Sequence, residues 1–155
     1  MTIRTKRITV DILMTIFFVL SFDIRWSVVS RNLIENEHAL IFHFVVGSIT
    51  AVLFFIHVWI NRQWLVSVGK ARKSGNLNRK TKWTYRIDMA LIVVWGINIL
   101  AGLAAMGYSI GGIEALHGLL SLHSITATLG LVLVIVHVIQ HMRQIKSYFR
   151  RSKTT

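Results

Sequence analysis

Four histidines lie in two apolar segments and share one spacing. The segment HFVVGSITAVLFFIH begins at His43 and ends at His57, and HSITATLGLVLVIVH begins at His123 and ends at His137. A helix of that length turns through about 1400°, roughly 40° short of four full turns, and rises about 21 Å. Both rings of a segment therefore lie on one helix face, near opposite edges of a hydrocarbon layer about 30 Å thick. Neutral imidazoles placed in this way can ligate iron or another transition metal at two depths.

The rest of the chain indicates what positions these rings. Of its 155 residues, 54% are hydrophobic and 15% are charged, and there is no Pro or Cys. Long apolar runs between charged stretches predict an all-α integral membrane protein. We expect one domain, residues 1–155, built as a bundle of four transmembrane helices at about 8–28, 39–60, 87–106 and 116–140. The lack of Cys excludes disulfides, iron–sulfur clusters ligated by Cys and covalently attached c-type haem.

Basic residues predict the orientation in the membrane. They gather in the N-terminal segment, in the connection between the second and third spans, and in the C-terminal tail. Because Lys and Arg concentrate in cytoplasmic loops, both termini are expected to be cytoplasmic, in a multi-pass protein of the cell inner (plasma) membrane. The net charge of +12 is accounted for by this topology and by contact with anionic membrane lipid. No nucleic-acid recognition motif accompanies the charge, so nucleic acid is not expected as a partner.

The second and fourth spans run in the same direction, which sets the depth of each histidine. His43 and His123 are expected at the outer depth, and His57 and His137 at the inner depth. Each pair could supply the two axial ligands of one haem iron, so these four histidines are the predicted metal ligands.

Two small residues lie inward of the outer histidines on the same helix faces. Gly47 follows His43 by one turn, and Gly130 follows His123 by two. A flat macrocycle between helices requires small neighbours, so both glycines are candidate haem contacts. Glycine also allows close packing of membrane helices without any ligand.

With these residues in place, the chain resembles the dihaem b-type membrane cytochromes, and in particular the small four-helix cytochromes associated with flavinylated extracytoplasmic proteins. The resemblance covers nearly the whole chain and rests on the four histidines and on helix parity. It implies two b-type haems and transmembrane electron transfer that links the quinone pool or a cytoplasmic donor to an extracytoplasmic flavin-bearing or other redox protein. The chain would then be an electron-transfer subunit of an oxidoreductase complex. The phrase SITA occurs at 48–51 and 124–127, an offset that differs from that of the histidines and argues against an in-register duplication.

Other functions remain open from the sequence. One alternative is a quinone-reactive cytochrome b subunit of a membrane dehydrogenase, in which quinone would be a further cofactor. Another is an ion or proton transporter based on histidine. Metal transport would favour a carboxylate beside the histidines, and no acid lies between the paired histidines of the second and fourth spans. A bundle in which the histidines are purely structural is the third.

The remaining polar residues are assigned by depth. His38 and His117 are expected at the outer membrane boundary. His141, one turn beyond His137, either contacts a haem propionate or meets the cytoplasm, and we favour the surface. Asp11 and Asp88 are expected to cap helix starts, with proton relay as the alternative. Candidate propionate partners, which would bind a carboxylate at the membrane edge, are Arg25, Trp26 and Arg31 outside and Arg62, Lys82 and Arg86 inside.

Overall fold

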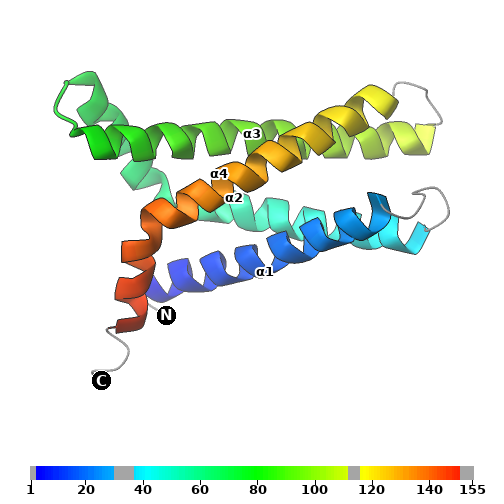
Figure 1. Cartoon of the computed structure of the whole chain (residues 1–155), viewed down its shortest axis with the longest axis horizontal. Helices are drawn as coiled ribbons and strands as arrows, with labels where there is room; N and C mark the ends of the chain where they lie inside the picture. The colour runs from blue at the N-terminus through cyan, green and yellow to red at the C-terminus, as the bar shows by residue number, and fades with distance from the viewer. Residues whose placement is uncertain (1–2, 30–36, 112–115, 151–155) are drawn as a thin grey trace. The chain divides into compact units, whose positions relative to one another are not determined.

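The chain forms four α-helices in the computed structural model, which describes residues 3–29, 37–111 and 116–150. They are α1 (Ile3–Val29), α2 (Glu37–Lys73), α3 (Arg79–Gly111) and α4 (Leu116–Arg150) (Figure 1). Each predicted span lies within one of these helices, and none of the described residues is in a strand. The all-α prediction is confirmed.

Three of the helices are long and apolar enough to cross a membrane. The segments that qualify among the described residues are His38–Lys73, Arg79–Gly107 and Gly118–Met142, with mean hydropathies of 2.4, 2.2 and 2.2. Their large apolar side chains remain exposed, as Leu100 and Ile139 are at 67% and 64%. Apolar faces left outside a helix packing are solvated by lipid in a membrane protein. The prediction of a membrane protein is thus confirmed, whereas the span in α1, the side of the termini and the particular membrane stay predictions.

The connection between α2 and α3 is a capped turn at the basic end of both helices. Gly75 has a φ of +77°, and the amides of Gly75 and Asn76 donate to the carbonyls of Arg72 and Ala71, each at 3.2 Å. This pair of bonds is a Schellman motif, which ends a helix at a glycine. Asn78 then caps α3, because its Oδ1 accepts a hydrogen bond of 2.8 Å from the amide of Thr81.

The chain divides into two compact units, each described here by itself. The first, Met1–Trp64, contains α1 and most of α2, and the second, Leu65–Thr155, contains the end of α2 with α3 and α4. In the second unit, α3 and α4 lie side by side in opposite directions (Figure 1). Small buried residues, Ala101 and Ala105 on α3 and Gly130 on α4, let these two helices pack closely.

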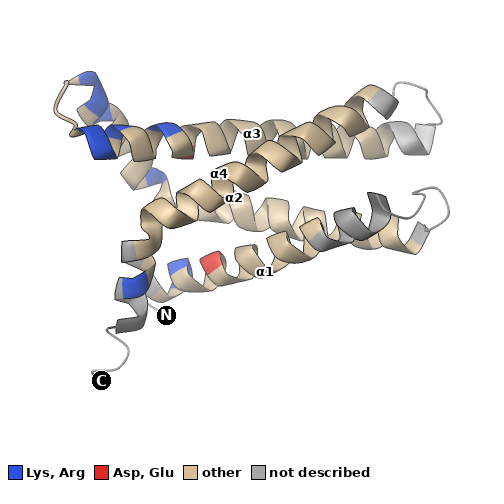
Figure 2. Cartoon of the chain, viewed as in Figure 1, with Lys and Arg blue, Asp and Glu red and all other residues tan. Residues whose placement is uncertain are grey.

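Basic side chains mark one end of each unit, which we call the inner end. They include Arg7 and Arg62 in the first unit and Arg79 and Arg86 in the second, and Figure 2 shows the gathering at the start of α3. The other end of each unit is called the outer end.

Candidate functional site

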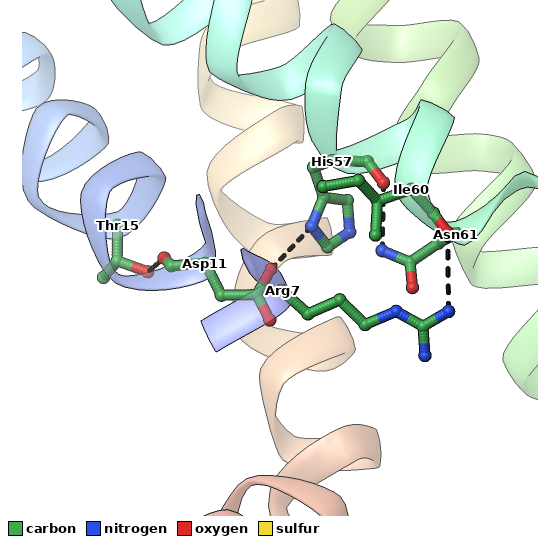
Figure 3. Close-up of polar contacts among 6 residues, drawn as sticks. All are labelled: Arg7, Asp11, Thr15, His57, Ile60 and Asn61. Atoms are coloured by element: carbon green, nitrogen blue, oxygen red, sulfur yellow. Dashed lines mark hydrogen bonds and ion pairs between the residues drawn. The ribbon is translucent and has the colours of Figure 1, made fainter. Parts of the chain in front are cut away.

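His57 and Asp11 form a polar contact at the inner end of the first unit. His57 on α2 places its Nδ1 2.7 Å from the Oδ1 of Asp11 on α1 (Figure 3). An ionised carboxylate only accepts hydrogen bonds, so Nδ1 carries the hydrogen and donates it. In the neutral imidazole the other ring nitrogen, Nε2, then has the lone pair that metal ligation requires.

Neighbouring hydrogen bonds hold this pair in place. The side-chain amide of Asn61 donates to the main-chain oxygen of His57 at 2.9 Å. Arg7, one turn before Asp11, donates from Nη2 to the main-chain oxygen of Ile60 at 3.4 Å (Figure 3). Arg7 and Asp11 thus both link α1 to α2 at the depth of the His57 ring.

The second unit repeats the contact with His137 and Asp88. His137 on α4 has its Nδ1 2.7 Å from the Oδ1 of Asp88 on α3. Asp88 is buried, with 7% of its surface exposed. A buried carboxylate needs compensating hydrogen bonds, and the imidazole N–H supplies one. His137 therefore has the same hydrogen placement as His57.

His141 lies beside this second pair. Its ring centroid is 4.5 Å from that of His137, with the two planes tilted by 40°. Its Nε2 lies 3.7 Å from the Oδ2 of Asp88. Only a quarter of the His141 side chain is exposed, so it lies at the helix interface more than at the surface position that we favoured.

His123 is held at the outer depth by Asn98 of α3. Its Nδ1 lies 2.9 Å from the main-chain oxygen of Asn98, and a carbonyl oxygen only accepts, so Nδ1 again carries the hydrogen. The Asn98 side chain donates back to the main-chain oxygen of His123 at 2.7 Å and to Oγ1 of Thr126 at 3.0 Å. Gly102 makes room for the ring, because a Cβ there would lie 3.0 Å from both Cε1 and Nδ1 of His123.

The two predicted haem-contact glycines have different surroundings. A Cβ on Gly47 would meet Oγ of Ser21 at 3.8 Å, an ordinary contact, whereas a Cβ on Gly130 would meet Nε1 of Trp95 at 3.0 Å. Gly130 therefore packs against the indole of α3, as the close-packing alternative requires. His43 is half-buried on α2, on the helix that also carries Gly47.

Three of the candidate propionate partners are among the described side chains, Arg62 in the first unit and Lys82 and Arg86 in the second. The guanidinium of Arg62 lies 3.7 Å from the ring centroid of Trp59, a cation–π contact within α2. Lys82 and Arg86 line a hollow of about 470 Å³ with Arg79 and Trp83. His38 is exposed near the start of α2. The side chains of Arg25, Trp26, Arg31 and His117 lie outside the described residues.

The expectation that Asp11 and Asp88 cap helices is wrong. α1 begins at Ile3 and α3 at Arg79, so both acids lie more than two turns inside their helices. Their carboxylates face histidines of the next span instead. The sequence did carry one signal for these contacts, namely depth. Each acid lies near the inner end of its predicted span, and the inner histidine of the following span also lies near the inner end.

Asp88, His137 and His141 also form a set of potential metal ligands. One ligand atom from each of the three lies within 4.8 Å of the others. Two imidazoles and a carboxylate form a donor set that zinc accepts. The carboxylate absent from the second and fourth spans is thus supplied by their neighbouring helices.

Comparisons of this chain with protein-family models, with curated proteins and with solved structures each found no match.

Proposed function

We propose that the protein transfers electrons across a membrane through two b-type haems, each held by a histidine of α2 and a histidine of α4. The observation that carries the proposal is the state of the rings. Three of the four predicted ligands, His57, His123 and His137, direct Nδ1 to an acceptor. Such partners are typical of metal-bound histidines, because they fix the tautomer and the orientation of the ring.

Each part of the chain has a definite task in this proposal. Haem supplies one-electron chemistry at its iron. The chain's own residues bind it through Nε2, while Asp11, Asp88 and the main chain of Asn98 keep the hydrogen on Nδ1. The apolar, lipid-facing helices exclude water and set the two ligand levels about 21 Å apart along the helices. His43 with His123 would form the outer site, and His57 with His137 the inner site.

The proposed setting is the plasma membrane, where the basic ends of the helices would face the cytoplasm. The chain would link a cytoplasmic donor or the quinone pool to an extracytoplasmic redox protein, as the family resemblance implies. In that arrangement the chain is the electron-transfer subunit of a larger oxidoreductase.

Purification of the full chain with haem present during expression tests the proposal. We expect about two extractable haems per chain and a low-spin, six-coordinate spectrum in both oxidation states. His57→Ala should remove the inner component and His43→Ala the outer one. His38→Ala is the matched control, because His38 is exposed on the same helix, and it should keep both. A protein without haem, or with the open iron of a high-spin spectrum, would contradict the proposal.

Vesicles then test the transmembrane step. A reductant confined outside should reduce an acceptor confined inside, or the reverse, only when both haems are present. His57→Ala should stop this transfer while the outer haem still accepts electrons from the outside. Ion flux without any electron donor, combined with no electron transfer in the wild type, would reject the function.

Metal transport is a second candidate, favoured by the cluster of Asp88, His137 and His141. The haem-free chain would then bind Zn²⁺, which a competing chromophoric chelator can measure. Loss of that binding in His141→Ala, with uptake of Zn²⁺ by wild-type vesicles, would establish transport. Zn²⁺ binding that is absent from the haem-loaded chain, with no flux, would assign these residues to the haem site.

A further inference from the structure

The two inner histidines and the outer His123 differ in the chemistry of their hydrogen-bond partners. Both inner histidines, His57 and His137, face a carboxylate at 2.7 Å. The outer His123 faces a neutral main-chain carbonyl at 2.9 Å. The acid contact occurs at the inner end of each unit, since each unit supplies its own acid.

An ionised acceptor changes the imidazole more than a neutral one does. Hydrogen bonds to a charged acceptor are roughly twice as strong as neutral ones, and a carboxylate draws the Nδ1 hydrogen toward itself and makes Nε2 a more basic ligand. A more basic ligand stabilises the ferric iron relative to the ferrous iron. The negative charge of the carboxylate acts in the same direction, because the oxidised site carries one more positive charge.

We propose that Asp11 and Asp88 make the inner haem the lower-potential one, so that electrons pass preferentially from the inner end to the outer end. This inference rests on the proposed function. With haem bound as proposed, the inner iron would be oxidised from ferrous to ferric, and its single electron would reduce the outer iron from ferric to ferrous. A cytoplasmic donor or a quinol would then reduce the inner iron again.

The two acids contribute unequally. Asp88 is buried, whereas the Asp11 side chain is 42% exposed. A buried charge is screened less, so it acts more strongly on the iron. Arg7 lies one turn from Asp11, and Nε2 of His141 lies 3.7 Å from Oδ2 of Asp88. The Arg7 guanidinium is always charged and offsets Asp11 at every pH. Asp88 is therefore the main positioning residue for the ring and the main cause of the lower potential.

Potentiometry of the purified, haem-loaded chain, followed by visible absorption, tests the inference. His43→Ala retains only the inner component, which assigns the two midpoint potentials to the two depths. We expect the inner midpoint to lie below the outer one. Asp88→Asn, which keeps an acceptor oxygen but removes the charge, should raise the inner midpoint and leave the outer one in place. Asp11→Asn should raise it by less, and Asp88→Glu should keep it low.

The control is Gly96→Ala on α3. A Cβ at this position meets nothing within 4 Å, so neither midpoint should move. Low-spin signals in electron paramagnetic resonance establish that each variant keeps both ligands. If Asp88→Asn loses its inner haem, the inner midpoint potentials of Asp11→Asn and Asp88→Glu decide the outcome. Asp11→Asn must then raise the inner midpoint, and Asp88→Glu must keep it low.

Several outcomes overturn the inference. It is wrong if the inner midpoint equals or exceeds the outer one, or if neither Asp11→Asn nor Asp88→Asn shifts the inner midpoint in a chain that keeps two low-spin haems. A wild-type chain without haem would instead refute the proposed function itself, so the two failures are distinct.

Discussion

Gly102→Ala on α3 tests whether His123 is held as described. A methyl group at this position would lie 3.0 Å from Cε1 and Nδ1 of the His123 ring. Carbon atoms in favourable contact are about 3.5–4.0 Å apart, so the ring must move by about half an ångström. The ring is rigid and its Nδ1 is bonded to the Asn98 oxygen, so this movement stretches that hydrogen bond.

The expected cost follows from three contributions. Overpacking costs roughly 1–3 kcal/mol, and weakening a hydrogen bond costs up to about 1.5 kcal/mol. The better helix preference of alanine returns at most about 1 kcal/mol. The net expectation is that Gly102→Ala destabilises the chain by about 2 kcal/mol, the middle of a range from about 0 to 4.5 kcal/mol.

Unfolding of the haem-free chain in mixed micelles, followed by circular dichroism, measures this difference. Gly96→Ala is the matched control on the same helix, because a Cβ at Gly96 meets nothing within 4 Å. It should be neutral or stabilise by up to about 1 kcal/mol. Equal stability of the two variants would refute the packing of His123 against Gly102.

Two further substitutions test the positions of glycines. Gly130→Ala should destabilise by about 1–3 kcal/mol and change the fluorescence of Trp95, since its Cβ would lie 3.0 Å from the indole nitrogen; unchanged fluorescence and stability would contradict that contact. Gly75→Ala should cost about 1–2 kcal/mol, because φ is +77° there, and should increase cleavage by a protease added at the turn. Gly107→Ala, which meets nothing within 4 Å, is the control for both.

The helices could be predicted from the sequence because the spans are long, apolar and separated by charge. The ends of the helices could not. α2 was expected to leave the apolar region near residue 60, yet it continues to Lys73, since no proline or glycine turn interrupts it before Gly75. Hydropathy locates the part of a helix that crosses the membrane, whereas capping groups decide where the helix ends.

The spacing of the histidines identified the candidate site but not the residues that support it. Asp88 and Asn98 contact histidines more than twenty positions away in the chain. No periodicity within one helix reports such a contact. Asp88 was assigned to a helix cap because it lies near the start of an apolar run. The start of α3 at Arg79 shows instead that Asp88 lies inside the helix. Gly102 gave no signal at all, because its role depends on a ring of another helix.

The acid–histidine contact forms in both units, and the cost of an unpartnered ionisable side chain in a membrane helix explains why. Asp11 and His57 are 46 residues apart, while Asp88 and His137 are 49 apart, so the two hairpins reach the same contact from sequences that are out of register. An ionisable side chain inside a membrane helix is costly unless it has a partner, and the imidazole N–H at the same depth provides one in each hairpin. Each inner histidine and its acid therefore stabilise one another, and the buried Asp88 depends on this contact more than the part-exposed Asp11 does.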